Sequence, residues 1–367
     1  KTVIAVTGTH GKTTTTALLA HIFEIAGLEP SFFIGGVMTN YGKNFKLNKG
    51  KYFIIEGDEY DSAFFEKFPK FIMYRPHHLI ITSLEFDHAD IYNNVSEIEH
   101  WFKGLINCIP RSGTIIYSDL YDNIINLAAN AYGKIRSFGG ERSDYAITNL
   151  FLENNISTFD IENKHNENNS FKIKTSLIGN FNRQNIIAAA AMALELGIEK
   201  TSIAKAIETF HGVKRRQELI YSNNNIKIYE DFAHHPTSIK YILSAMREQY
   251  PQACLWAIYE PRSATSRRNI HQKELINSFK ESDWTLIKNP YNLESIPQKD
   301  QINIHEVIEK INAYKENSCS LFNSSNEIIE FILKNMNSEE DNIILLMSNG
   351  GFDNIYKKIT TAFSNKN

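Results

Sequence analysis

A glycine-rich turn near the start of the sequence contains residues suited to phosphate chemistry. The segment Gly8-Thr-His-Gly-Lys-Thr13 follows an apolar run and precedes a helix expected at 12–26. Glycines let backbone N–H groups converge on an anion, and a helix N-terminus adds partial positive charge. Lys12 would neutralise the β- and γ-phosphates of a nucleotide, and the Thr13 hydroxyl would bind Mg²⁺. The segment therefore predicts a nucleoside triphosphate site.

One position departs from the usual phosphate-loop motif, G-x-x-x-x-G-K-[ST], because Val6 stands where its first glycine belongs. An ordinary strand-to-helix turn is the alternative interpretation. The Lys-Thr pair and the flanking strand and helix favour phosphate binding. The predicted nucleotide contacts in the turn are Gly8, Thr9, His10, Gly11, Lys12, Thr13 and Thr14.

Acidic residues and a histidine follow two later apolar runs. Glu56 and Asp58 come after the run at 52–55, and Asp87 and His88 come after the run at 79–84. Because the carboxyl ends of parallel strands meet at one edge of a sheet, we expect these side chains near the phosphates. A set of oxygen ligands with one imidazole suits Mg²⁺ or Mn²⁺. The clusters lack the four Cys and His residues that a zinc site would need. Helix capping or a surface turn is the alternative for each cluster.

The composition is that of an ordinary globular protein, and 367 residues predict two or three domains. The net charge of -3 gives no reason to expect nucleic acid or an acidic membrane surface as a partner. No apolar run reaches the roughly 18 residues of a membrane span. Three widely spaced cysteines, at 108, 254 and 319, make no disulfide framework, so we expect a reducing cytoplasm. The chain starts directly on a strand at Lys1, and we expect that a preceding segment has been removed.

The order of predicted elements indicates an α/β fold in two domains. Strands alternate with helices up to about residue 144, which favours a mostly parallel sheet, and short pieces at 145–178 predict a small antiparallel β region beside it. Helices are expected at 185–196 and 201–210, and the alternation restarts after residue 212 with a helix at 236–249. We therefore predict a phosphate-loop domain at 1–212 and a smaller, Rossmann-like doubly wound domain at 213–367.

Five segments in order resemble the muramyl ligase family: GTHGKTTT, EGDEYDSAFF, EFDHADIY, GNFNRQN and DFAHHPTS. The resemblance runs from residue 1 to about residue 352. Members of that family build peptidoglycan peptides and comprise a nucleotide-sugar domain, a central ATPase domain and a C-terminal domain. The resemblance implies the last two here, and we expect the uridine diphosphate-binding domain to lie outside this chain. The segments similar to the murein-recycling branch are Tyr60, Phe64-Phe65, FDHAD at 86–90, EPRS at 260–263 and MSNGG at 347–351.

The resemblance implies further contacts with the nucleotide and its metal ion. By it, Glu56 and His88 complete the metal environment. Asn182 and Asn185 approach the adenine, and Arg216 meets the γ-phosphate from across a cleft between the domains. A charge on the hinge surface is the alternative for Arg216, and an amide on a helix face is the alternative for Asn185.

The second domain supplies the remaining implied contacts. Asp231 resembles the ribose-binding acid of the family, and His234 and His235 lie beside it at a predicted helix start. Arg262 and Ser263 fall where the family holds the incoming peptide. Exposed histidines at the start of a helix are the alternative for the His-His-Pro run.

The activity that the resemblance implies is an ATP-dependent ligation with Mg²⁺, or Mn²⁺, as the metal. The lactyl carboxylate of UDP-N-acetylmuramic acid would be activated as an acyl phosphate. The amine of the recycled tripeptide L-Ala-γ-D-Glu-meso-diaminopimelate would then attack it. Addition of L-alanine alone is the alternative ligation, and a nucleotide-binding switch without bond formation is the alternative of another class. The expected partners are these small molecules, without nucleic acid or membrane, and the oligomeric state stays open.

Overall fold

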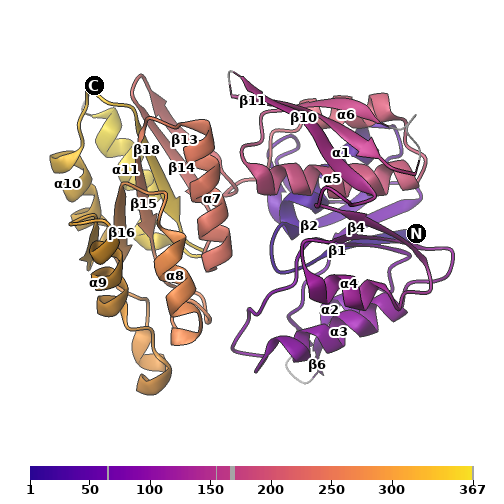
Figure 1. Cartoon of the computed structure of the whole chain (residues 1–367), viewed down its shortest axis with the longest axis horizontal. Coiled ribbons are helices and arrows are strands. Elements are labelled where there is room, and N and C mark those ends of the chain that lie inside the picture. The colour runs from indigo at the N-terminus through magenta and orange to yellow at the C-terminus, as the bar shows by residue number, and fades with distance from the viewer. Residues whose placement is uncertain (64–65, 154, 166–169, 366–367) are drawn as a thin grey trace. The chain divides into compact units, whose positions relative to one another are not determined.

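The computed structural model describes residues 1–63, 66–153, 155–165 and 170–365. Phe64-Phe65, which we singled out from the sequence, lie outside the described residues. The chain divides into two compact units, Lys1–Lys214 and Arg215–Asn367, which the colour bar of Figure 1 distinguishes by residue number. Within the described ranges, no helix is both long and apolar enough to cross a membrane.

The first unit is built on a ten-stranded sheet with the order β12-β11-β10-β9-β8-β7-β1-β4-β2-β3. The strands from β10 through β9 to β2 are parallel. At the two ends of the sheet, β3 pairs antiparallel with β2, and β11 pairs antiparallel with both β10 and β12. A separate two-stranded sheet follows β4. The strands are β1 (Thr2–Thr7), β2 (Ser31–Met38), β3 (Lys43–Lys46), β4 (Tyr52–Glu56), β5 (Asp61–Ala63), β6 (Glu66–Pro69), β7 (His78–Ile81), β8 (Thr114–Ser118), β9 (Lys134–Phe138), β10 (Tyr145–Glu153), β11 (Ile156–Asn163) and β12 (Phe171–Thr175).

Helices cover both faces of this sheet (Figure 1). Side chains alternate across a strand, so Ile4 and Val6 of β1 pack into the core formed with α1, α5 and α6. Ala5 packs on the opposite face, with α2, α3 and α4. Burial on both faces explains why β1, β4, β7 and β8 are short apolar runs. The helices are α1 (Lys12–Ile25), α2 (Lys70–Met73), α3 (Val95–Asn107), α4 (Asp122–Ala128), α5 (Asn180–Glu195) and α6 (Lys200–Glu208).

The second unit has a six-stranded sheet with the order β13-β14-β18-β15-β16-β17, parallel except for the β13–β14 hairpin. Helices α10 and α11 cover one face, and α7, α8 and α9 pack side by side. The strands are β13 (Glu218–Asn223), β14 (Ile226–Asp231), β15 (Cys254–Tyr259), β16 (Trp284–Lys288), β17 (Cys319–Phe322) and β18 (Asn342–Met347). The α-helices are α7 (Pro236–Gln249), α8 (Gln272–Ser278), α9 (Ile304–Tyr314), α10 (Ser325–Asn335) and α11 (Ile355–Ser364), and short 3₁₀ turns are η2 (Asn269–His271), η3 (Leu293–Ser295), η4 (Gln298–Asp300) and η5 (Phe352–Asn354).

The predicted α/β fold class is confirmed, with two differences in detail. The antiparallel strands β10–β12 continue the main sheet through β9 and do not form a region beside it. Helix α5 begins at Asn180, five residues before the predicted start at 185, because Gly179 with φ 90° ends the preceding extended segment. Asn182 and Asn185 both lie on this helix, as the resemblance of the GNFNRQN segment implied.

Candidate active site

The glycine-rich turn joins β1 to α1 with close backbone packing. Gly11, at the N-cap of α1, has φ 82°, a left-handed conformation that glycine adopts at little cost. A Cβ there would lie 2.4 Å from the Asn185 side-chain oxygen. Gly8 has φ 135°, and its Cβ would lie 2.3 Å from Thr82 Oγ1. Both glycines are therefore required by conformation and by space, and the turn presents the N-terminus of α1 as a site for an anion.

The turn is held by the segment that follows β7. The His10 backbone N–H donates to Ser83 Oγ at 2.7 Å, and the Glu85 N–H donates to Thr9 Oγ1 at 2.8 Å. His10 Nε2 lies 2.8 Å from a Glu85 carboxylate oxygen. Thr9 and His10, predicted as nucleotide contacts, thus also anchor the turn to the sheet edge.

A buried ion-pair network surrounds Lys12. Its Nζ lies 2.9 and 2.8 Å from the two Glu59 carboxylate oxygens, and His88 Nε2 lies 2.9 Å from one of them. Burial alone would raise the pKa of Glu59, but the charge of Lys12 and the hydrogen bond from His88 outweigh it and hold the pKa at about 2. Burial would likewise lower the pKa of Lys12, and the neighbouring carboxylates raise it instead. Glu59 therefore stays ionised between the Lys12 ammonium and the His88 ring.

Glu56 lies next to Thr13 at the end of β4. The Thr13 hydroxyl donates to Glu56 Oε1 at 2.9 Å, and the Gly35 N–H donates to Glu56 Oε2 at 2.6 Å. A Cβ on Gly35 would lie 2.9 Å from both carboxylate oxygens, so the glycine lets the β2 backbone approach Glu56. Two of the predicted metal ligands, Thr13 and Glu56, are thus adjacent, whereas the Nε2 contact of His88 is made with Glu59.

Helix α5 supports the phosphate turn through two buried amides. Thr15 Oγ1 lies 3.1 Å from Asn185 Oδ1, and the Asn185 amide donates to Asn182 Oδ1 at 3.2 Å. Asn182 in turn donates to the Ile178 carbonyl at 3.0 Å. These bonds position α1 against α5, and the predicted adenine contacts of both residues stay predictions.

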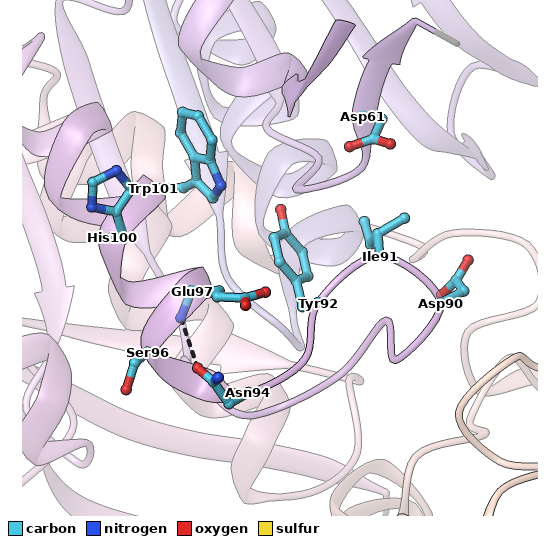
Figure 2. Close-up of a pocket in the computed structure, with 9 residues that line it drawn as sticks. All are labelled: Asp61, Asp90, Ile91, Tyr92, Asn94, Ser96, Glu97, His100 and Trp101. Atoms are coloured by element: carbon cyan, nitrogen blue, oxygen red, sulfur yellow. Dashed lines mark hydrogen bonds between the residues drawn. The ribbon is translucent and has the colours of Figure 1, made fainter. Parts of the chain in front are cut away.

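A pocket of about 680 Å³ lies beside the ion-pair network (Figure 2). Tyr92, which is 7% exposed, lines it and donates its hydroxyl to the Glu59 carbonyl at 2.6 Å. Asn94 caps α3 by accepting the Glu97 N–H at 3.1 Å, the bond drawn in the figure. The lining residues are Asp61, Asp90, Ile91, Tyr92, Asn94, Ser96, Glu97, His100 and Trp101. The pocket is therefore acidic and partly aromatic. Its connection to the phosphate turn runs from Tyr92 to Glu59 and from Glu59 to Lys12.

In the second unit, the two adjacent arginines have different surroundings. Arg215 pairs with Glu230 at 2.5 Å and donates to the carbonyls of Ser348 and Gly350 at 3.1 and 2.8 Å. The guanidinium of Arg216 lies 4.8 Å from the centre of the Phe232 ring. Arg215 therefore ties the start of this unit to the end of β18, and the predicted γ-phosphate contact of Arg216 stays a prediction.

Asp231 ends β14 with its carboxylate buried in backbone hydrogen bonds. The N–H groups of Gln217 and Ala233 donate to it at 2.8 and 2.7 Å. Burial raises the pKa of Asp231, and the nearby Arg216 charge opposes that rise. His235 is the N-cap of α7, where its ring accepts the Thr237 N–H at 3.3 Å. Asp231, which the resemblance places at the ribose, is thus held rigidly at the carboxyl end of a parallel strand.

His234 and the EPRS segment lie on the same unit. The Nδ1 of His234 lies 3.0 Å from the Phe232 carbonyl. Arg262 stacks over Tyr291 at 4.0 Å, and a Cβ on Gly350 would lie 2.1 Å from Arg262 Cδ. Ser263 Oγ accepts the Ser266 N–H at 3.0 Å, which closes a local turn. The predicted peptide contacts of Arg262 and Ser263 stay predictions.

Comparison with known proteins gives matches in both units. A model described as the Mur ligase middle domain matches residues 6–193, and one described as the Mur ligase, glutamate ligase domain matches residues 215–350. The chain belongs to the Mur ligase family. Mur ligases use ATP to form a C–N bond, so this chain is an ATP-dependent ligase.

Individual relatives support the predicted branch. The UDP-N-acetylmuramate–L-alanyl-gamma-D-glutamyl-meso-2,6-diaminoheptandioate ligase of Haemophilus influenzae is 32% identical over 97% of this chain and 75% of the relative. A UDP-N-acetylmuramate–L-alanine ligase of Clostridium tetani is 30% identical over 96% of this chain and 74% of the relative. The crystal structure of a murein peptide ligase from Psychrobacter arcticus has a TM-score of 0.72 and 33% identity, covering 100% of this chain and 78% of that one.

Sequence reasoning assigned no individual role to one buried acid in each unit. Glu59, inside the quoted EGDEYD segment, received no role, although it contacts both Lys12 and His88. Glu260, fully buried, accepts Ser348 Oγ at 2.7 Å and lies 3.1 Å from Lys288 Nζ. The available signal was an acid after an apolar strand: Glu260 directly follows β15, and Glu59 lies three residues after the end of β4. Such a position indicates an edge of the sheet but does not identify the partner of the acid.

Proposed function

We propose that this Mur ligase joins UDP-N-acetylmuramate to the tripeptide L-alanyl-γ-D-glutamyl-meso-diaminopimelate at the expense of ATP. The observation that carries the proposal is the 32% identity, over 97% of the chain, to a ligase named for that reaction. The arrangement of Lys12, Thr13 and Glu56 around a phosphate turn supports the use of ATP at the same site. We further propose that residues 1–212 form the ATP-binding domain and 213–367 the C-terminal ligase domain.

The proposed chemistry has two steps. A carboxylate is a poor acyl donor, because its leaving group would be oxide. The lactyl carboxylate oxygen attacks the γ-phosphorus of ATP, the bond to the bridging oxygen of ADP breaks, and an acyl phosphate forms. The amine of L-alanine then attacks the acyl carbon, loses a proton, and inorganic phosphate leaves with its electron pair. Lys12 neutralises charge on the transferring phosphoryl group, which is the main protein contribution in phosphoryl transfer.

The residues beside the turn fit a magnesium ion. The Thr13 hydroxyl and the Glu56 carboxylate are hard oxygen donors 2.9 Å apart, the type of ligand that Mg²⁺ prefers, and Mn²⁺ suits the same set. We propose that Thr13, Glu56 and His88 hold the ion, with His88 binding it through the ring nitrogen that does not contact Glu59. When bound, the ion would screen phosphate charge. Glu56 is already oriented by the Gly35 N–H at 2.6 Å.

For the second unit, we propose the roles that the family resemblance implies. Arg216 contacts the γ-phosphate, Asp231 the ribose, and Arg262 and Ser263 the peptide. The rigid backbone bonds around Asp231 support a fixed ligand-binding position. We expect a cytoplasmic location, because ATP and the sugar nucleotide are cytoplasmic compounds.

A second candidate is addition of L-alanine alone, favoured by the 30% identity to an L-alanine ligase. The test supplies ATP and UDP-N-acetylmuramate, adds either the tripeptide or L-alanine as the acceptor, and measures phosphate release. Mass spectrometry then identifies the products. We expect amide product and faster release with the tripeptide. Faster reaction with L-alanine would move the assignment to the second candidate. ATP hydrolysis without amide under both conditions would contradict both ligations and favour a nucleotide-dependent switch.

A further inference from the structure

The hydrogen-bonding capacity of Lys12 is matched by protein acceptors in the structure. Its Nζ donates to the Gly8 carbonyl at 2.6 Å and to the Glu59 Oε1 and Oε2 atoms at 2.9 and 2.8 Å. An ammonium group has three N–H donors, so these three acceptors account for all of them. A phosphate oxygen can therefore bind Lys12 only by replacing one of these partners. Gly8 is part of the turn itself, which makes Glu59 the replaceable partner.

Glu59 is held from other directions as well. Its carboxylate keeps the His88 Nε2 contact at 2.9 Å, and its carbonyl accepts the Tyr92 hydroxyl at 2.6 Å. The ring of Tyr60 packs at 4.1 Å from the His88 ring, which fixes the histidine beside the carboxylate. Glu59 is only 3% exposed. The carboxylate would consequently stay in place, on His88, after Lys12 turned to a phosphate.

We propose that Glu59 is a positioning residue that acts as an internal substitute for nucleotide phosphate. It holds the Lys12 ammonium at the turn, yields it to the β- and γ-phosphates when nucleotide binds, and keeps His88 oriented throughout. This inference rests on the proposed use of ATP at the turn. It assigns a role to the second glutamate of the EGDEYD segment, which differs from that of Glu56.

The proposal predicts the sign of an effect that a purely structural role would not produce. Because Glu59 and the phosphates compete for one ammonium group, removing the charge of Glu59 should tighten nucleotide binding while slowing turnover. Glu59→Gln keeps the size of the side chain and removes that charge. Removing the one charged group that competes with phosphate for Lys12 should lower the dissociation constant of the nucleotide about tenfold.

Calorimetric titration with ADP in EDTA measures this competition without metal or turnover. The full chain carrying Glu59→Gln should bind ADP about tenfold more tightly than wild type. Glu208→Gln is the matched control, because it makes the same substitution at an exposed side chain on α6, in the same unit. It should change ADP affinity by less than about twofold. Equal or weaker binding by Glu59→Gln, or equal tightening by both variants, overturns the inference and leaves the ATP assignment intact. If wild type binds no ADP, both fail.

A second measurement covers the case in which Glu59→Gln does not fold. A crystal structure of the unmodified full chain with ADP should show Lys12 Nζ within hydrogen-bond distance of a β-phosphate oxygen and separated from at least one Glu59 oxygen. His88 should still contact Glu59 there. If Lys12 keeps both Glu59 contacts with ADP bound, the carboxylate is no substitute for phosphate and the inference is wrong.

Discussion

Substitution of Gly11 by alanine tests how tightly the phosphate turn is built. Gly11 is the N-cap of α1 with φ 82°, and an added Cβ would lie 2.4 Å from Asn185 Oδ1. Asn185 is 5% exposed and is bonded to Thr15 and Asn182. The added methyl group therefore strains the backbone and also pushes on a side chain that has little room to move.

The expected loss of stability follows from these contacts. A left-handed backbone costs a non-glycine residue about 1–2 kcal/mol. Displacing Asn185 would weaken its bonds to Thr15 and Asn182, each worth about 0.5–1.5 kcal/mol. Gly11→Ala should therefore lower the free energy of unfolding by about 2–5 kcal/mol. It should also weaken ADP binding, because the turn can no longer hold its shape.

Gly27 provides a matched control at the other end of the same helix. It has φ 74°, but a Cβ there would meet nothing within 4 Å. Gly27→Ala should thus cost only the backbone contribution, about 1–2 kcal/mol, and leave ADP affinity unchanged. Urea unfolding and ADP titration of both variants measure the difference. Equal losses of stability, with equal ADP affinities, would refute the reasoning, because the Asn185 contact would then contribute nothing.

Three further outcomes are expected. Lys12→Met should abolish phosphate release and lower the free energy of unfolding by about 3–5 kcal/mol, since Glu59 stays buried without its cation. Adding Glu59→Gln to this variant should recover stability but not turnover. Strictly additive losses of stability in the double variant would contradict the pairing of Lys12 with Glu59. Arg215→Met should lower the free energy of unfolding, because the hydrogen bonds of Arg215 to its four partners are lost. Arg216→Met should instead reduce turnover at unchanged stability. The reverse pattern in urea unfolding and phosphate-release assays would exchange the two roles. Burial lowers the pKa of His21 from 6.5 to about 4, so the unfolded state binds the proton first as pH falls. Stability should then drop by up to about 3 kcal/mol between these pH values, and His21→Gln should reduce that dependence in urea titrations at about pH 7.5 and 5.

Much of the fold follows from local patterns in the sequence. The run at 52–56 is β4, and the predicted helix at 236–249 matches α7 (Pro236–Gln249). In both cases a short apolar run or a proline at the helix start specifies the element within a few residues. The continuity of β10–β12 with the main sheet was not predictable in this way. It depends on the pairing of β10 with β9, a contact that the alternation of residues along β10 does not encode.

At the candidate site, too, some contacts were predictable from the sequence and others depended on the tertiary structure. Thr13 and Glu56 were expected together because each follows a strand that enters the same sheet edge, and the structure places them 2.9 Å apart. His88 was expected at the metal, and the structure gives its ring a contact with Glu59. A carboxylate at the end of a strand has several neighbours within reach, and only the path of the following loop selects among them.

The glycine, lysine and threonine spacing at residues 8–13 was sufficient to indicate a phosphate turn, because all of its geometry lies within one strand-to-helix connection. The partner of Lys12 was decided by tertiary structure alone. Glu59 lies 47 residues further along the chain and reaches Lys12 through the loop after β4. A buried charge must find an opposite charge or lose its ionisation, and packing, not spacing along the chain, determines which one is available.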